Sequence, residues 1–413
     1  MSVWPLTAEP ALSVGGVGLT VIAERFGTPA YVVDEEDVRA RCREYSKAEG
    51  LHEVAYAAEA FWCRAMARWI AEEGLSLGVC SEGQLVVAGA VGFPAERILM
   101  HGDGRTPGEL LSAIDYGISR FVIDSPNEIA QLAAVADRPQ RVLLQVTPGI
   151  DAHAGNGTGD EDEQFGFSTV SAAAAAAAQR IRALPSLELA GLYCHLGSQV
   201  TSIGQYEAVA RRLIAFMAKL GGLPELNLGG GHAVSCQPGD QNLDVTEFAR
   251  RISGVVRRAC SAYGIPAPRL TIEPGRAIAG QAGLTLYRVL TVKRGPRTLV
   301  VVDGGMSDSE RPAPHGRRHI ERVGTPTAAP AEPVTVVGRH CQAGDVLVSD
   351  ALLPGDIRPG DLLAMPCTGA YHHAMASNYN LLARPPVIAV RDGRAWPVIR
   401  RETDEDILRR DVG

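Results

Sequence analysis

Four groups of residues in this chain have the types needed for chemistry, and each follows or ends an apolar, β-type run. Glu59 follows VAYAA, His195 ends LAGLYCHL, a Gly229–Gly231 triplet follows ELNL, and Glu273 begins the segment Glu-Pro-Gly-Arg. Carboxylates and imidazoles transfer protons, and a glycine triplet lets backbone N–H groups come close to an anion. Together these groups predict a pocket that binds an anionic ligand and moves protons.

Each of these features also has a plain structural explanation. A glycine-rich turn after a strand is usually an ordinary turn, and a lone histidine at a strand end is often a satisfied structural residue. The Glu-Pro-Gly-Arg segment alone is a turn with an exposed arginine. Their shared position at the ends of β-type runs is what favours a pocket.

The elements that must position these groups alternate regularly between about residues 54 and 274. Eight alternations of a β-type run with helical apolar spacing predict a closed parallel (β/α)₈ barrel, and an open doubly wound sheet is the competing arrangement. In a barrel, the chemistry lies at the carboxyl ends of the strands. The predicted strands are 54–58, 77–80, 97–100, 120–124, 141–146, 189–196, 225–229 and 269–273.

The chain changes character after about residue 280. Runs such as LTLYRVLTV, TLVVVDG, PVTVVG, GDLLAM and PPVIAV are separated by Gly, Pro and Asp, which predicts an all-β domain. We expect the α/β fold class, with a (β/α)₈ barrel over residues 35–278 and a β-barrel or sandwich-like domain from residues 1–34 and 279–413. Residues 321–333, rich in Pro, Ala and Thr, are expected to form a loop.

Composition excludes several classes of protein. The net charge of −7 argues against a broad nucleic-acid surface, and no apolar run approaches the roughly 20 residues that cross a membrane. The first ten residues lack the pattern of a secretory signal, so we expect a cytoplasmic protein. The eight cysteines include no C-x-x-C pair, and we expect neither disulfides nor a metal site.

A series of ordered motifs resembles a known family. HLGSQ (195–199), GGG (229–231), EPGR (273–276), VDGGMSD-x-x-RP (302–312), C-x-x-GD (341–345) and TGAY…SNYN (368–380) follow the order seen in fold type III pyridoxal-phosphate decarboxylases, of which diaminopimelate decarboxylase is the nearest member. The match runs from about residue 29 to 380. It implies a cofactor-binding barrel, a β-domain, and a head-to-tail homodimer with active sites shared between subunits.

The resemblance also implies roles for residues of the barrel. His195 would stack on the cofactor ring, and Glu273 would face the pyridine nitrogen, where a carboxylate keeps that nitrogen protonated. Arg276 would hold a substrate carboxylate. The residues that would surround the cofactor phosphate are Ser198, Gly229, Gly230, Gly231, Gly275 and Tyr371.

The same resemblance assigns residues of the β-domain. Arg311 would hold a substrate carboxylate, and Tyr371 would also contact the substrate. Cys341 and Tyr371 match residues that reach the active site from the second subunit, where the family cysteine protonates the carbanion after carbon dioxide leaves. The substrate implied is a small amino acid or carboxylate.

One departure bears on the mechanism. Family members carry a lysine in a Y-A-x-K-A-N type segment after the first barrel strand, and this chain has Glu59 at that position, in the segment YAAEAF. A carboxylate cannot form a Schiff base with the cofactor. The flanking lysines, Lys47 and Lys219, lie far from this segment in the sequence. Any bound cofactor is therefore expected to be held without a covalent bond.

Two substrate-reading positions also differ from the family pattern. His315 replaces a tyrosine, and Gln342 replaces a glutamate that would bind a distal ammonium group. A neutral amide holds a cation less well than a carboxylate does. Diaminopimelate is therefore not the expected substrate, whereas Arg311 still suits a substrate that carries a carboxylate.

Three functions stay open at this point. The chain is an atypical amino-acid decarboxylase of a specialised pathway, with Glu59, Cys341 and His195 as catalytic groups; or a decarboxylase or lyase that works without a cofactor; or an inactive paralogue that regulates a true decarboxylase by joining its dimer. Glu59 itself has a structural alternative, an ion pair with Arg64 or Arg105.

Overall fold

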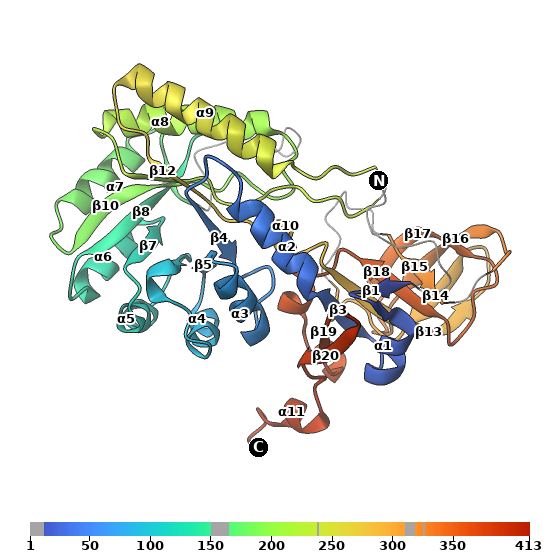
Figure 1. Cartoon of the computed structure of the whole chain (residues 1–413). Helices are drawn as coiled ribbons and strands as arrows, with labels where there is room; N and C mark the ends of the chain where they lie inside the picture. Colours follow the sequence, from blue (N-terminus) through green and yellow to red (C-terminus); the bar gives the residue numbers. More distant parts are fainter. Residues whose placement is uncertain (1–11, 150–164, 238, 310–318, 325–326) are drawn as a thin grey trace. The chain divides into compact units, whose positions relative to one another are not determined.

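The computed structural model describes residues 12–149, 165–237, 239–309, 319–324 and 327–413. The chain divides into two compact units. The barrel unit comprises Ala40–Ala233 and Gln241–Ala277, and the β unit comprises Met1–Arg39, Val234–Asp240 and Ile278–Gly413. Figure 1 labels the elements of both units along the chain.

The barrel unit contains eight parallel strands that close on themselves. Neighbouring strands pair in chain order, and pairing of the fifth strand with the sixth joins the two halves into one ring. The open doubly wound alternative is therefore wrong, and the predicted barrel and all eight predicted strands are confirmed. The strands are β4 (Glu53–Ala57), β5 (Ser76–Val79), β6 (Ile98–Met100), β7 (Arg120–Ile123), β8 (Gln140–Thr147), β10 (Leu187–Tyr193), β11 (Glu225–Asn227) and β12 (Arg269–Ile272).

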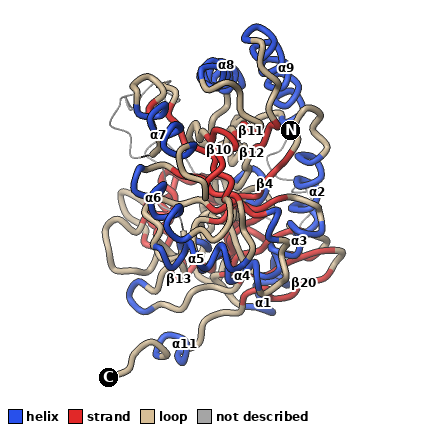
Figure 2. The backbone as a smooth tube through the Cα atoms, turned by 90° about the vertical axis from the view of Figure 1, so that its left-hand side faces the viewer, coloured by secondary structure: helices blue, strands red, loops and turns tan. Residues whose placement is uncertain are grey.

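Helices connect the strands and lie outside them, as Figure 2 shows in blue around the red strands. Several begin where local chemistry dictates. At α5, the Thr106 side chain accepts from the Glu109 backbone N–H while the Glu109 carboxylate accepts from the Thr106 N–H, a capping box with proline at the first position. The helices are α2 (Glu35–Ser46), α3 (Arg64–Glu72), α4 (Glu82–Gly89), α5 (Pro107–Tyr116), α6 (Pro126–Val135), α7 (Ala173–Arg182), α8 (Ile203–Lys219) and α9 (Val245–Tyr263).

The β unit is built on a mostly antiparallel sheet in the order β17-β16-β14-β13-β3-β19-β20. The long strand β13 is central, because it also pairs with β18. Strand β3, from the start of the chain, pairs with both β13 and β19. The strands are β3 (Ala30–Asp34), β13 (Gly283–Lys293), β14 (Thr298–Val302), β15 (Glu321–Val323), β16 (Ala331–Val337), β17 (Val346–Pro354), β18 (Leu362–Pro366), β19 (Val387–Arg391) and β20 (Arg394–Ile399).

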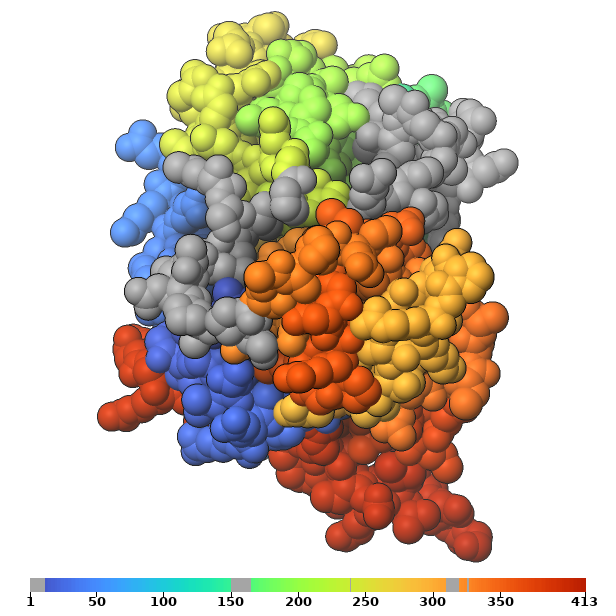
Figure 3. Space-filling view, turned by 90° about the vertical axis from the view of Figure 1, so that its right-hand side faces the viewer, coloured from blue at the N-terminus to red at the C-terminus, as the bar shows by residue number. Residues whose placement is uncertain are grey.

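Two apolar clusters hold this unit together. One includes Val32, Leu286 and Ile388, and the other includes Val300 and Val336. Figure 3 shows the outer surface of the unit's strands in orange and red. The loop expected over residues 321–333 is wrong at both ends, because β15 and β16 occupy them. Pairing with β18 and β17 outweighs the local turn propensity there.

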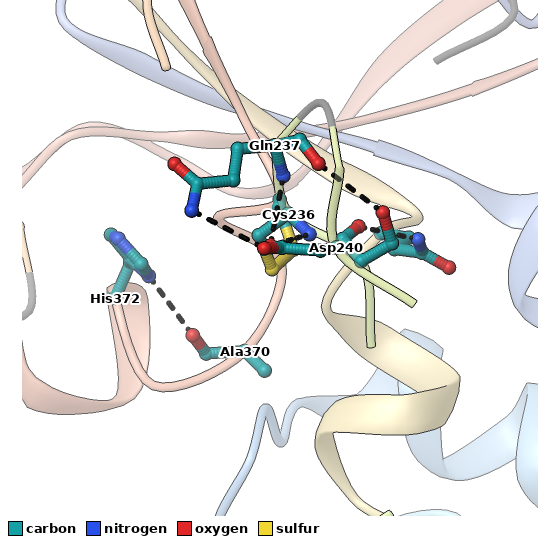
Figure 4. The surroundings of a disulfide bond; sticks show 8 residues. Cys236, Gln237, Asp240, Ala370 and His372 are labelled. Atoms are coloured by element: carbon teal, nitrogen blue, oxygen red, sulfur yellow. Dashed lines mark hydrogen bonds between the residues drawn. A yellow bond between two sulfur atoms is a disulfide. The ribbon is translucent and has the colours of Figure 1, made fainter. Parts of the chain in front are cut away.

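A disulfide joins Cys236 to Cys367 within the β unit, so the expectation of no disulfides is wrong. The two cysteines are 131 residues apart in sequence, and only the fold brings their Cα atoms to 5.4 Å. Figure 4 shows the bond beside Asp240, whose carboxylate accepts from the backbone N–H groups of Cys236 and Gln237. A search for neighbouring cysteines cannot detect such a pair.

None of the helices in the described part of the chain has the length and apolar character needed to cross a bilayer. Within the same residues, no group of three or more His, Cys, Asp or Glu side chains is placed to hold a metal ion.

Candidate active site

Glu273 lies directly after β12, at the carboxyl end of the barrel, and is 6% exposed. Its Oε1 accepts a hydrogen bond from Nδ2 of Asn227 at 2.7 Å and lies 3.0 Å from Nε2 of His101. Asn227 ends β11 and His101 follows β6, so three strands fix one carboxylate. Its hydrogen bonds within the described residues both fall on Oε1, which leaves Oε2 for a ligand.

The glycine triplet follows β11, and its tight packing admits no side chain. A Cβ on Gly230 would lie 2.2 Å from the Glu273 carbonyl oxygen, and one on Gly231 would lie 1.8 Å from that of Gly197. Gly229 and Gly231 also have φ of +63° and +82°, in the left-handed region. The backbone alone therefore requires these glycines, which brings the ends of three barrel strands together.

His232 follows the triplet and is 2% exposed. Its Nδ1 lies 3.0 Å from the Tyr45 hydroxyl, and its ring packs against Tyr206 and Phe248. Burial lowers the pKa of His232 to about 3, so the imidazole is neutral near neutral pH. We infer that His232 has a structural role and holds the adjacent glycine triplet in place through these contacts.

His195 follows β10 and is close to the triplet. A Cβ on Gly229 would lie 3.1 Å from Nδ1 of His195. Burial lowers the pKa of His195, while the charges of Glu59 and Glu273 act in the opposite direction. One histidine therefore responds to both carboxylates, which places the predicted groups His195, Glu59 and Glu273 in one electrostatic neighbourhood.

Glu59 lies two residues beyond the end of β4. Its segment packs on the glycine after Glu-Pro, because a Cβ on Gly275 would lie 3.1 Å from Cβ of Ala60 and 3.2 Å from Cβ of Ala57. The Glu59 side chain is exposed in this chain. Arg105, one of its two expected partners, pairs instead with Glu128 through Nε at 3.0 Å.

Cys80 is a neighbour of Glu59 that the sequence did not single out. It follows β5, and burial together with the charges of Glu59 and Glu273 raises the pKa of its thiol to about 12. The thiol is therefore protonated near neutral pH. Burial and the charges of the same two carboxylates raise the pKa of Tyr193, at the end of β10, above its usual value. The ring of Tyr193 lies 5.0 Å from that of His101.

The residues missed from sequence are His101, Asn227, Cys80 and Tyr193. His101 follows the predicted strand 97–100 and Cys80 ends the predicted strand 77–80, so the rule used for Glu59 and His195 could have found these two. Asn227 and Tyr193 end the observed strands β11 and β10 but lie inside the longer strands predicted from sequence. No local motif marks them, however, because their role comes from contacts between strands distant in sequence.

The other barrel residues predicted from the resemblance also lie at this end. Arg276 begins the short helix α10 (Arg276–Ala279) directly after Gly275 and is half-buried. Ser198 is exposed and follows Gly197, whose carbonyl faces Gly231. Their contacts with a ligand stay predictions.

Three further candidates belong to the β unit. Cys341 is exposed with a φ of +53°, and Tyr371 has a φ of +66°. The Gln342 amide oxygen accepts a hydrogen bond from the Tyr379 hydroxyl at 2.8 Å. Their approach to an active site stays a prediction, and Arg311 and His315 lie outside the described residues.

A buried carboxylate fixed at the carboxyl end of a closed parallel barrel, beside a histidine and a glycine triplet, defines a barrel enzyme with its active site at that rim. The chain belongs to the pyridoxal-dependent decarboxylases, because the model of their pyridoxal-binding domain matches residues 35–280. It is therefore a carbon–carbon lyase by class.

Known relatives agree with this membership. A diaminopimelate decarboxylase of Actinosynnema pretiosum subsp. auranticum is 52% identical over 416 residues, covering 99% of this chain and 95% of the relative. One from Bacillus subtilis (strain 168) is 38% identical over 97% of this chain and 95% of its own. The crystal structure of M. jannaschii diaminopimelate decarboxylase in co-complex with L-lysine superposes with a TM-score of 0.92 at 28% identity, covering 98% and 97% of the two chains.

The cofactor of this family is pyridoxal phosphate, and the rim suits its noncovalent contacts. Oε2 of Glu273 is available to a protonated ring nitrogen, and the glycine triplet presents backbone without side chains, which lets its N–H groups approach an anion. Position 59 carries a carboxylate, which supplies no amine for a covalent bond.

Proposed function

We propose that this chain is an amino-acid decarboxylase that holds pyridoxal phosphate, or its aminated form, without a covalent bond. The observation that carries the proposal is Glu59, a carboxylate in the segment packed on Gly275 and electrostatically coupled to His195 and Cys80. When bound, the cofactor supplies an electron sink for the bond broken at the substrate α-carbon.

In this proposal the barrel residues orient the cofactor. Glu273, held by His101 and Asn227, faces the ring nitrogen and keeps it protonated. His195 covers one face of the ring. The glycine triplet, Gly275, Ser198 and Tyr371 surround the phosphate. Gly230 and Gly231 supply backbone N–H donors, because the N–H of Gly229 already donates to Oδ1 of Asn227 at 2.9 Å.

Glu59 acts as the general acid and base at this position. Its carboxylate accepts a proton from the substrate α-ammonium group and so delivers the free amine. A carboxylate there also attracts the positively charged amino group, which favours binding of the aminated cofactor or of an amino-acid substrate.

The substrate is recognised by charge. Arg276 and Arg311 hold carboxylates by paired N–H donors, and His315 and Gln342 shape the distal pocket. The relatives are named for diaminopimelate, which carries a distal ammonium. The neutral Gln342 favours a different substrate for this chain. Cys341, supplied with Tyr371 by the second subunit of a homodimer, returns the proton to the α-carbon.

The proposal is tested by adding pyridoxal phosphate to the purified protein, measuring the dissociation constant from the absorbance change, and then reducing with borohydride. We expect binding with no covalent attachment in the natural protein. Glu59→Lys should gain about one covalently attached cofactor per chain, and the matched control Glu59→Gln should gain none.

Three results would contradict the proposal, each differently. Covalent attachment to another amino group of the natural protein would remove the unanchored mechanism. Turnover of an amino acid by protein that binds no cofactor would favour a cofactor-independent lyase. Neither binding nor turnover, together with mixed dimers formed with an active decarboxylase, would favour a regulatory paralogue.

A further inference from the structure

The opposite end of the barrel, where the strands begin, contains a cavity of about 640 Å³. We call this end the floor. Its lining includes the first residue of several strands, and charged side chains dominate it. The residues that matter here are Glu53, Arg97, Arg120, Arg141, Glu225 and Arg269.

Two of the three floor carboxylates, those of Glu53 and Glu225, already have all their oxygens paired. Arg120 donates from Nη1 and Nη2 to the two oxygens of Glu53 at 2.8 and 3.0 Å, and its Nη2 also donates to Oε2 of Glu225 at 3.3 Å. The remaining oxygen of Glu225 accepts from Arg141. All four oxygens of the two glutamates therefore have guanidinium partners.

The donors of the floor are not saturated. Nη2 of Arg269 lies 4.0 Å from Glu53, and Nε of Arg141 lies 4.0 Å from Glu188, both beyond hydrogen-bond distance. Their side chains are 58% and 38% exposed, so a ligand can reach them.

Buried positive charge adds to this excess. Arg97 donates to the backbone carbonyls of Ala71 and Leu75, which carry no net charge. Nε of Arg97 and Nε of Arg120 are buried and have no hydrogen-bond partner within the described residues. Arg120 as a whole is only 8% exposed.

The lining carries four arginines and three glutamates, Glu96 being the third, so the formal charge is 4 − 3 = +1. His52 also lines the cavity, and its Nδ1 accepts a hydrogen bond from the Leu270 N–H. A lining whose two buried glutamates are fully paired, and which has open donors and surplus positive charge, lacks one component, an anion.

We propose that the floor cavity binds a small oxyanion, either phosphate or a polycarboxylate. The planar guanidinium groups of Arg141 and Arg269 hold its oxygens by paired N–H donors at the cavity mouth, and the charges of Arg97 and Arg120 attract it from within. The site is separate from the rim, so it does not depend on the proposed decarboxylase function.

The test is calorimetric titration of the full-length protein at constant ionic strength with inorganic phosphate and, separately, with citrate. We expect one floor site per chain. Arg141→Gln combined with Arg269→Gln should weaken it at least tenfold, about 1.4 kcal/mol. Both side chains are partly exposed, so the variant should fold.

Arg250→Gln is the matched control, because Arg250 is 70% exposed on α9, pairs with Glu247 and is not part of the floor lining. It should bind both anions as the natural protein does. Tighter phosphate binding would identify a phosphoryl ligand, and tighter citrate binding a carboxylate metabolite. Phosphate binding at the rim would be unchanged in the double variant. Only binding that the double variant loses is therefore assigned to the floor.

Two outcomes would overturn the proposal. One is equal binding by the double variant and the natural protein for both anions. The other is an equal loss in the double variant and in Arg250→Gln, which would show general charge attraction rather than a site.

Discussion

Buried glutamates at the two ends of the barrel have different hydrogen-bond partners. At the floor, Glu53 begins β4 and receives two hydrogen bonds from the charged Arg120. At the rim, Glu273 follows β12 and receives its hydrogen bonds from the amide of Asn227 and the imidazole of His101. Ion pairs therefore connect the strands at the floor. At the rim, the carboxylate of Glu273 is held in place without an arginine or lysine partner among its hydrogen bonds in the described part of the chain.

The consequence is visible in the titration of the two regions. Burial acts to raise the pKa of Glu53, but the hydrogen bonds and charge of Arg120 outweigh it and leave that pKa below its usual value. The rim glutamates instead act on their neighbours, and both contribute to raising the pKa of Cys80. The floor therefore stabilises the fold, and the rim keeps its charge for a ligand.

Replacing Arg120 by methionine should have the largest effect. The change leaves Glu53 and Glu225 without their buried partner, and breaking such a pair typically costs about 3–5 kcal/mol in the free energy of unfolding. Urea denaturation measures this cost. Arg138→Met is the control, because Arg138 is half-exposed, its ion pair with Asp137 is long at 3.5 Å, and its other hydrogen bond goes to the uncharged carbonyl of Ile114. A cost below about 1 kcal/mol for Arg120→Met would remove the structural role of the floor.

The pH dependence of stability should separate the two ends. The pKa of His232 falls from its ordinary value of about 6.5 in the unfolded chain to about 3 in the fold, so the unfolded state binds more protons between these values. Stability should fall as pH drops from about 6.5 toward 3, with a limiting slope of about 1.4 kcal/mol per pH unit. His232→Gln should flatten this region.

The contribution of Glu53 falls in a lower window. Its pKa is depressed in the fold, so its stabilisation is complete above its unfolded pKa of about 4.3 and is lost as pH falls through the folded value. Denaturation midpoints measured from pH 8 to pH 3 check both windows. A profile that stays flat down to pH 4.5 would contradict a neutral, buried His232.

A smaller effect is expected at the support of Glu273. His101→Phe removes one of the two hydrogen bonds to its carboxylate, and the affinity for pyridoxal phosphate should fall about tenfold, since a hydrogen bond to a charged group contributes roughly 1.5 kcal/mol. Absorbance titration measures it. His52→Phe alters a histidine of the floor and should leave the affinity unchanged. Equal losses in both variants would mean that the two ends are not independent.

Arg269→Gln should have the smallest effect on stability. Its guanidinium lies 4.0 Å from Glu53 and the side chain is 58% exposed, so the pair contributes between 0 and about 1 kcal/mol. Thermal or urea denaturation without added anions is the measurement. A loss comparable to that of Arg120→Met would show that the outer arginine, too, is part of the structural network.

Much of the barrel follows from local sequence patterns. Its strands are short apolar runs between amphipathic helices, and their carboxyl ends locate Glu59, His195 and Glu273 by rule alone. The order and identity of the sequence motifs indicated which family the chain resembles. Strands β17 and β20 were not among the runs named from sequence, because Ser349 and Asp350 interrupt the apolar pattern of β17 and Pro397 lies inside β20.

Contacts between distant residues could not be predicted in this way. His101 and Asn227 meet Glu273 across 172 and 46 residues of sequence, and Arg120 reaches Glu53 and Glu225 across 67 and 105. No local pattern marks a partner at such separations. Arg105, one of two candidate partners for Glu59 in the structural alternative, pairs instead with Glu128.

The bond between Cys236 and Cys367 closes a covalent ring that contains β12 and the strands from β13 to β18. A single proteolytic cut anywhere within that ring would leave both fragments attached to each other until a reductant is added. The β unit is thereby protected against losing half of its sheet to one cleavage. A gel would display two separate fragments only in the presence of reductant, which frees the thiols of Cys236 and Cys367.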